Sequence, residues 1–335
     1  MSPRALGATG LAVTPLAFGC AALGDMPATF GYGVPEERAL AALRAALSGP
    51  VTMLDTAGAY GDGESERRIG LALRELGGLP PGRVLATKAG RDPRTGRFGA
   101  DEVRRSVERS LRLLGLERLQ LVHLHDPEHT TFEAALAPGG PVAALERLQG
   151  EGLVAHIGIA GGPVDLLARF VATGRFAVVV THNRYTLLHR GARPLLALAA
   201  RRGVAVLNAA PYASGLLARG PGSGARYAYR PAPADVIWRA RSIEARCRAR
   251  GVPLAAAALG HSLREPSISA TIVGVDGPEQ VEETLRLAGH PIPDELWPEL
   301  EAYADDERDP EAPAGAQPAR GGAGAPGDAS SSRSR

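Results

Sequence analysis

Eight short apolar runs, rich in β-branched residues, alternate with longer segments of helical periodicity along most of the chain. The runs are LAFGCA (16–21), VTMLDTA (51–57), VLATK (84–88), LQLVHLH (119–125), VAHIGIA (154–160), FAVVVTHN (176–183), VAVLNAA (204–210) and ATIVGV (270–275). Segments between them, such as residues 100–115 and 278–289, place apolar residues at helical spacing and end in glycine. A strand–helix unit repeated eight times predicts an α/β protein whose parallel strands close into a (β/α)8 (TIM) barrel.

An open, doubly wound sheet is the competing architecture for alternating strands and helices. That fold binds dinucleotides through a G-x-G-x-x-G turn after an early strand. The nearest matches, GYGVPE (31–36) and GDGESE (61–66), both have glutamate at the last position. The sequence therefore favours the barrel, preceded by a short N-terminal hairpin.

The stretch from residue 309 to residue 335 has a different composition. It consists mainly of proline, glycine, alanine and serine, with almost no large apolar side chain. Such a segment buries too little apolar surface to offset the entropy lost on ordering. We therefore expect one domain over residues 1–308, followed by a disordered tail over residues 309–335.

Charge and cysteine content limit the partners and the compartment. The chain has 38 basic and 36 acidic residues, a net charge of +2, and no long block of like charge, so no nucleic-acid partner is indicated. No apolar run reaches about 18 residues, and the first residues do not form an export signal, so no membrane association is expected. Two cysteines, Cys20 and Cys247, form no disulfide framework. A cytoplasmic protein of open oligomeric state fits these observations.

Polar residues end five of the eight predicted strands. The carboxyl ends of barrel strands are where such proteins carry their chemistry. The polar residues at or just after these ends are Asp55, Tyr60, Lys88, His125, Asn183 and Asn208. Because the second, third and fourth strands are neighbours, we expect the first four of these side chains to converge at one mouth. Taken alone, an aspartate that caps a turn and a tyrosine on the rim would also have a purely structural explanation.

The four converging side chains suggest a proton-transfer site. A tyrosine hydroxyl titrates too high to accept a proton near neutral pH, and the ammonium of Lys88 would lower its pKa. Asp55 would hold and balance that ammonium. Tyr60 would then exchange a proton with a substrate oxygen as a hydride is transferred, while His125 donates a hydrogen bond to the same oxygen.

Longer segments resemble the aldo-keto reductases over roughly residues 3–305. These are LGATGLAVTPLAFG, DTAGAYGDGESERRIG, LATK, SLRLLGLERLQLVHLHDPE and IVGVDGPEQVEETL. The resemblance implies an oxidoreductase that moves a hydride between NAD or NADP and a small-molecule carbonyl or sugar hydroxyl, with Asp55, Tyr60, Lys88 and His125 as its catalytic tetrad. HNRYTLL (182–188) and NAAPYASGLLA (208–218) are similar to the branch of D-threo-aldose, L-fucose and D-galactose 1-dehydrogenases, some members of which oxidise pyridoxal.

The resemblance also implies where the cofactor binds. The implied contacts are Asn183, Asn208, Ser214, Gly215, Leu216, Gly274, Asp276 and Gln280, with the backbone amides of residues 274–280 as the seat of a phosphate.

The chain departs from the family pattern around the cofactor. It has Ala160-Gly161 where Ser-Asn is usual, and His182 where glutamine is usual. Gln280 stands where an arginine often binds the 2′-phosphate of NADP, and Asp276 is nearby. The sequence therefore favours NAD over NADP.

A metal-dependent hydrolase on the same barrel is an alternative. His123 and His125 point to one face of the fourth strand, and His156, His182 and Asp276 lie on or after other strands. The HDPEH segment (125–129) also matches a zinc motif formally, but Pro127 excludes the helix that this motif requires. We expect no bound metal.

A catalytically silent subunit that keeps the cofactor pocket is a further alternative, although all four tetrad side chains are present. The glycine- and proline-rich segment 215–234 suits either a loop that closes over a ligand through Tyr227, Tyr229 or Arg230, or a mobile connector. The arginine-rich stretch 238–251 is interpreted as an outer barrel helix.

Overall fold

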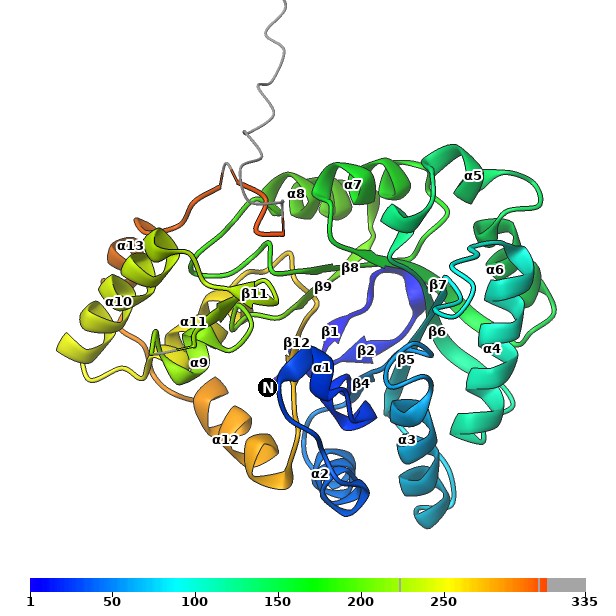
Figure 1. The fold of residues 1–335 in the computed structure, drawn as a ribbon, viewed down its shortest axis with the longest axis horizontal. Helices are drawn as coiled ribbons and strands as arrows, with labels where there is room; N and C mark the ends of the chain where they lie inside the picture. Colours follow the sequence, from blue (N-terminus) through cyan, green and yellow to red (C-terminus); the bar gives the residue numbers. More distant parts are fainter. Residues whose placement is uncertain (223, 307, 312–335) are drawn as a thin grey trace, which may run out of the picture.

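The computed structural model describes residues 1–222, 224–306 and 308–311, and all eight predicted strands are present. The strands are β3 (Leu16–Gly19), β4 (Met53–Asp55), β5 (Val84–Gly90), β6 (Leu119–His125), β7 (Val154–Gly161), β8 (Val178–His182), β9 (Ala205–Ala209) and β12 (Ala270–Gly274). They are all parallel and close in the order β12-β3-β4-β5-β6-β7-β8-β9 (Figure 1). The prediction of a TIM barrel in a single domain is confirmed.

Alternation along each strand separates two cores. One set of side chains, including Met53, Val84, Leu121 and Leu207, packs together inside the barrel. Their chain neighbours belong to the larger core between the strands and the helices. Because the period is two residues, Asp55, Lys88 and His125 share the inward face with these interior residues. The barrel therefore aims all three at its mouth.

Helices surround the barrel as an outer ring (Figure 1). The main ones are α2 (Glu36–Ser48), α3 (Glu64–Glu75), α4 (Ala100–Leu114), α6 (Pro141–Gly150), α7 (Val164–Ala172), α8 (Arg193–Arg202), α10 (Ala234–Ala249), α11 (Leu254–Leu263) and α12 (Pro278–Ala288). α4 shows how these helices pack and end. It buries Val103, Val107 and Leu114 at helical spacing, and it ends at Gly115, whose φ is 68°. α10 buries Ile243 and Cys247, as expected for an outer helix.

The predicted N-terminal hairpin closes the amino-terminal end of the barrel. β1 (Arg4–Ala5) pairs antiparallel with β2 (Ala12–Val13), and Leu6 and Val13 are fully buried within the interior core. Arg4 donates to the carbonyl oxygens of Leu263 (2.9 Å), at the end of the helix Leu254–Leu263, and Ile268 (2.6 Å), just before β12. The open end of the barrel is therefore the one at the carboxyl ends of the strands.

The C-terminal segment returns to the barrel after the short helix α13 (Leu296–Glu301). The Asp305 amide donates to the Leu188 carbonyl (3.0 Å), and a ring nitrogen of His189 lies 2.8 Å from the Arg308 carbonyl. Asp309 and Glu311, at the start of the expected disordered tail, both contact Arg184. Residues 309–311 therefore pack against the barrel, and the remainder of that tail, residues 312–335, lies outside the described residues.

No helix within the described ranges is long and apolar enough to cross a membrane.

Candidate active site at the barrel mouth

Lys88 forms the centre of the site. Its ammonium donates to Asp55 Oδ2 (2.5 Å), to the Thr56 carbonyl (2.9 Å) and to the Tyr60 hydroxyl (3.0 Å). An ammonium has three N–H donors, so all of them are used. The Tyr60 oxygen therefore accepts from Lys88, which leaves its own hydrogen free to point toward a ligand.

Burial and charge oppose each other at Tyr60. Burial raises its pKa, the charge of Lys88 lowers it, and the charge of Asp55 raises it, so that the net pKa lies above the ordinary value. Lys88 thus acts in the direction expected from the sequence, but burial, which was not part of that expectation, outweighs Lys88 and gives the net increase. Burial also lowers the pKa of Lys88, but Asp55 and Tyr60 outweigh it and raise that pKa.

His125 completes the group as a neutral imidazole. Burial holds its pKa well below the ordinary histidine value, and the charge of Lys88 adds to this effect. Its ring meets the ring of Tyr60 edge-on, with centroids 5.9 Å apart and planes at 84°. A neutral imidazole carries one N–H donor, which suits a hydrogen bond to an oxygen beside Tyr60.

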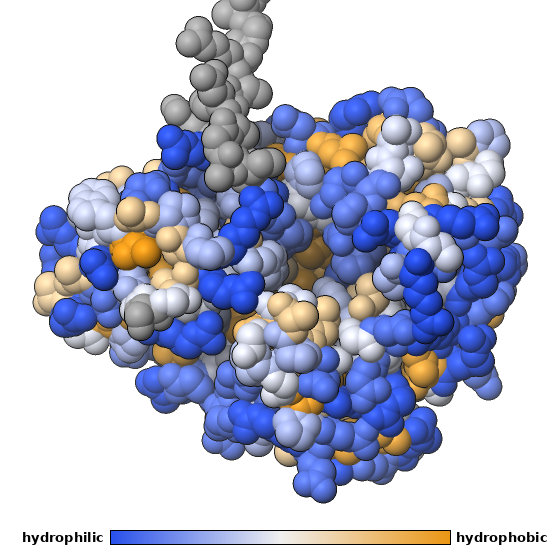
Figure 2. All heavy atoms as spheres, viewed as in Figure 1, coloured by the Kyte–Doolittle hydropathy of each residue, from blue (hydrophilic) through white to orange (hydrophobic). Residues whose placement is uncertain are grey.

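The face that carries these residues is hollowed near its middle, with apolar atoms at the base and hydrophilic atoms around much of the rim (Figure 2). A cleft of about 530 Å³ adjoins the tetrad on the side of β5 and α4 and includes Lys88, His125 and Asp126 in its lining. Its outer wall comes from α4 and the loop after β5, where Arg105 pairs with Glu102. The cleft gives a small molecule access to the Lys88–His125 side of the site.

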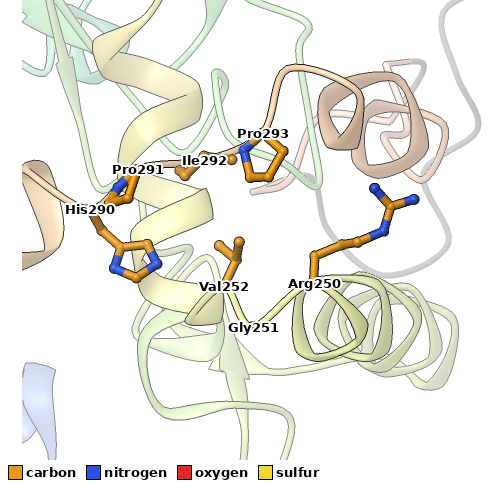
Figure 3. Close-up of a pocket in the computed structure, with 7 residues that line it drawn as sticks. All are labelled: Arg250, Gly251, Val252, His290, Pro291, Ile292 and Pro293. Atoms are coloured by element: carbon orange, nitrogen blue, oxygen red, sulfur yellow. The ribbon is translucent and has the colours of Figure 1, made fainter.

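A second cavity of about 480 Å³ lies elsewhere, between the turn that joins α10 to α11 and residues 290–293 (Figure 3). Its lining is mainly apolar, with Val252, Pro291 and Ile292, and Arg250 instead pairs with Glu299 at 2.7 Å. No tetrad residue lines this cavity, so it is not the candidate active site.

Backbone strain is concentrated at the same mouth. Nine non-glycine residues in the described part of the chain have positive φ: Asp25, Asp62, Asp126, Asn183, Ala210, Ala213, Ser214, Ala228 and Tyr229. Every one of them lies in a loop that follows a barrel strand. Such conformations cost roughly 1–3 kcal/mol each and cluster at functional sites. The loops at this end are thus held in shapes that local preference alone would not select.

The predicted cofactor residues fall into separate groups. Asn183 directly follows β8, is fully buried, and has a side-chain oxygen that meets no donor among the described residues. Asn208 instead donates to Ser262 (2.7 Å) and to the Tyr185 carbonyl (2.9 Å). Since Leu207 points into the barrel, Asn208 points outward, and the structure does not bring its side chain to the mouth.

Ser214, Gly215 and Leu216 lie in the segment after β9. This segment contains a short helix, α9 (Leu216–Arg219), and a hairpin of β10 (Arg226–Tyr227) and β11 (Arg230–Pro231). The Ser214 hydroxyl accepts from the Tyr229 amide (2.8 Å), so the turn of the hairpin is tied to the loop beside the mouth. The hairpin of β10 and β11 therefore lies next to the loop that directly follows β9.

Gly274, Asp276 and Gln280 lie where β12 leads into α12. The Gln280 side chain accepts from the Asp276 amide (2.9 Å). A Cβ on Gly274 would meet nothing within 4 Å, so the backbone is open to a ligand there. Arg38 reaches this end of α12 and pairs with both Asp276 and Glu279, so its charge is balanced by two carboxylates.

The histidines do not form a metal centre in the described ranges. No group of three or more His, Cys, Asp or Glu side chains is placed there to hold an ion. His123 is fully buried in β6, and neither of its ring nitrogens has a hydrogen-bond partner among the described residues. His156 lies in the first half of β7, away from the mouth. Two carboxylates near the mouth, Asp309 and Glu311, were not predicted as site residues, because no local motif marks them.

A closed eight-stranded parallel barrel with a Lys–Tyr–Asp cluster at its mouth defines a TIM-barrel enzyme. The sequence model of the Aldo/keto reductase family matches residues 15–305, and the chain belongs to this family of NAD(P)-dependent oxidoreductases. That membership sets aside the metal-dependent hydrolase.

Named relatives agree with this assignment. The chain is 34% identical to D-threo-aldose 1-dehydrogenase of a Pseudomonas species, over 88% of this chain and 95% of that protein. It is 32% identical to L-galactose dehydrogenase of Arabidopsis thaliana, over 84% and 86%. The solved structure of the aldo-keto reductase AKR11C1 from Bacillus halodurans has the same fold, with a TM-score of 0.73, 24% identity, and coverage of 91% of this chain and 97% of that one.

Proposed function

We propose that this enzyme interconverts the hydroxyl group of an aldose in its cyclic form and the corresponding carbonyl, with Tyr60 as the general acid and base. The observation that carries the proposal is the bonding of Lys88, whose three donors tie Tyr60 to Asp55 and leave the Tyr60 hydrogen free. The two named relatives, an aldose and a galactose dehydrogenase, support a sugar as the substrate.

Each of the four site residues has a separate role in this reaction. NAD(P) accepts or delivers the hydride when it is bound. Tyr60 donates its proton to a carbonyl oxygen during reduction, and in oxidation it takes the proton from the hydroxyl. Neutral His125 donates a hydrogen bond to the same oxygen and orients it. Lys88 stabilises the phenolate form of Tyr60, and Asp55 balances the charge of Lys88 in the buried site.

The residues at the mouth suit a nicotinamide dinucleotide. The unpartnered oxygen of Asn183 is a buried acceptor for an amide N–H. Ser214, Gly215 and Leu216 precede and open α9, and Gly274, Asp276 and Gln280 precede and open α12, whose N-terminus favours a phosphate. Asp276 and Glu279 already balance Arg38, so a 2′-phosphate there would face acidic side chains. We therefore favour NAD over NADP.

The test is absorbance of the reduced nicotinamide, using purified protein, NAD or NADP, and aldoses including fucose and galactose, with pyridoxal for comparison. We expect reduction of NAD by an aldose.

The variant Tyr60→Phe should lose at least about 10²-fold in kcat, because the proton donor is absent, while the Kd for the cofactor stays within about twofold. Full turnover by Tyr60→Phe would disprove the assignment of Tyr60. Reduction of simple aldehydes without any action on sugars would keep the chemistry and reject the substrate.

A further inference from the structure

A buried arginine anchors the C-terminal segment beside the active site. Arg184 lies two residues beyond β8, and its side chain is only 2% exposed. Its guanidinium donates to Asp309 through Nε (3.0 Å) and Nη2 (2.7 Å). Removing the partner of a buried charge is strongly destabilising, because the charge is then left uncompensated. Residues 309–311 are therefore an integral part of this end of the barrel.

The anchor fixes the carboxylate of Glu311 over the end of β8. Glu311 Oε1 accepts from Asn183 Nδ2 (2.9 Å) and lies 3.0 Å from His182 Nδ1. Its other oxygen, Oε2, meets one donor among the described residues, Arg184 Nη2 at 3.3 Å. A carboxylate has about four acceptor positions, and the Glu311 side chain is 24% exposed. Oε2 can therefore accept a further hydrogen bond from a ligand.

Glu311 lies at the same end of the barrel as Tyr60. His182, which Glu311 contacts at 3.0 Å, ends β8 and shares the inward face of that strand with Val178 and Val180. The rings of His182 and Tyr229 lie 6.5 Å apart. Lys88 is on β5 and His182 on β8, three strands apart in a ring of eight. Glu311 thus lies on another side of the mouth from the Lys88–Tyr60 pair.

A second feature of the same place also indicates a ligand. The Asn183 side chain is fully buried, and its amide nitrogen already binds Glu311, while its oxygen has no donor in the described ranges. The Asn183 backbone is held at a φ of 59°. A buried acceptor left unpaired costs roughly 1–3 kcal/mol, so a donor is expected from a bound molecule, which under the proposed function is the nicotinamide amide. Glu311 Oε2 then lies beside the bound cofactor.

We propose that Glu311 is a specificity-determining residue that selects hydroxyl-rich substrates. Its Oε2 accepts a hydrogen bond from a substrate hydroxyl remote from the reacting carbon, while Tyr60 and His125 hold the reacting oxygen. Hydrogen bonds to a carboxylate are about twice as strong as neutral ones, which favours a polyol over an aldehyde without hydroxyls. This inference rests on the proposed function and adds the group that recognises the rest of the sugar.

The test compares Glu311→Gln with the wild type on two substrates, an accepted aldose and benzaldehyde, which has no hydroxyl group. We expect the KM for the aldose to rise about tenfold with kcat within about twofold. For benzaldehyde, both constants should stay within about twofold. The Kd of the reduced cofactor, measured by its fluorescence, should also stay within about twofold, because the lost contact is to the substrate.

Two further variants control this experiment. Glu299→Gln removes a carboxylate that pairs with Arg250 on the surface, and it should behave as wild type. Asp309→Asn removes one charge from the pair with Arg184 and should also raise the KM for the aldose, as Glu311→Gln does.

An unchanged KM for the aldose, equal losses on both substrates, or a tenfold weaker Kd for the cofactor would each overturn the inference. A wild type that reduces benzaldehyde but accepts no aldose would overturn it while leaving the proton chemistry intact, and a wild type inactive on both would remove the proposed function as well.

Discussion

At the scale of single residues, the site is built around one buried ion pair, Lys88 with Asp55. Lys88 is the one lysine in the sequence, so the other 37 of the 38 basic residues are arginines. Arginine pairs well with carboxylates, whereas an ammonium is a compact charge with three rotatable donors. That geometry suits the junction of Asp55, the Thr56 carbonyl and Tyr60.

The first prediction concerns pH. Burial raises the pKa of Tyr60, so the hydroxyl is protonated throughout the neutral range. Reduction requires that proton, and its kcat/KM should stay constant at neutral pH and fall only as the pH rises through the pKa of Tyr60. Oxidation requires the deprotonated form, and its kcat/KM should rise over the same alkaline interval. Steady-state rates in both directions provide the check.

Because Lys88 is the one lysine in the sequence, its protonation state can be measured directly. Protein labelled with 15N at the lysine ammonium should give one nitrogen resonance, from Lys88. Burial lowers the pKa of Lys88, but Asp55 and Tyr60 outweigh it, so the signal should remain that of an ammonium ion beyond pH 10. A reduction rate that falls through neutral pH, or an ammonium that titrates there, would contradict this account.

At the scale of elements, the strands were predictable because their signal is local. Each of the eight apolar runs became a barrel strand, and Asp55, Lys88 and His125 were found because they end such runs. Asn208 shows the limit of that reasoning. It also lies near a strand end, but the alternation that turns Leu207 inward turns Asn208 toward α11. A count of inward and outward positions along the strand would have found this from the sequence.

Close packing between helices gives the second prediction. A Cβ on Gly70 in α3 would lie 2.0 Å from the Leu113 carbonyl oxygen of α4, which cannot move aside cheaply. Gly70→Ala should therefore lower the free energy of unfolding by about 2 kcal/mol or more. The matched variant Gly150→Ala, at the end of α6, meets nothing within 4 Å and should raise it by about 0.5 kcal/mol. Urea unfolding of both variants measures the difference, and equal effects would refute the packing argument.

At the scale of the whole molecule, composition alone did not predict that residues 309–311 pack against the barrel. Residues 309–335 contain almost no large apolar side chain, which is why a tail was expected to begin at Asp309. Asp309 and Glu311 are held instead by charge, through a buried arginine 125 and 127 positions earlier in the chain. A pairing over such a separation leaves no periodicity or local motif, so it becomes visible only in three dimensions.

The docked segment gives the third prediction. Burial raises the pKa of Glu311, but its hydrogen bond to His182 and the charges of His182 and Arg184 outweigh that effect and lower the pKa from 4.5 to about 2. The stabilisation from this carboxylate is complete above pH 4.5 and is lost as the pH falls toward 2. Hydrogen exchange of residues 303–306 and 308–311, corrected for intrinsic rates, should accelerate over that interval before exchange of the barrel strands does. Simultaneous loss of protection everywhere would show that the segment is not docked separately.

The anchoring of Arg184 also sets an order of events during synthesis. A ribosome that has just added Arg184 must add another 125 residues before Asp309 exists, which takes roughly 6 to 25 s at ordinary elongation rates. Until then the guanidinium has neither of its two carboxylate partners and must stay hydrated. The strands that carry Asp55, Lys88 and His125 all emerge earlier, so the wall of the mouth that carries Glu311 is the last part of the site to form on a newly made chain.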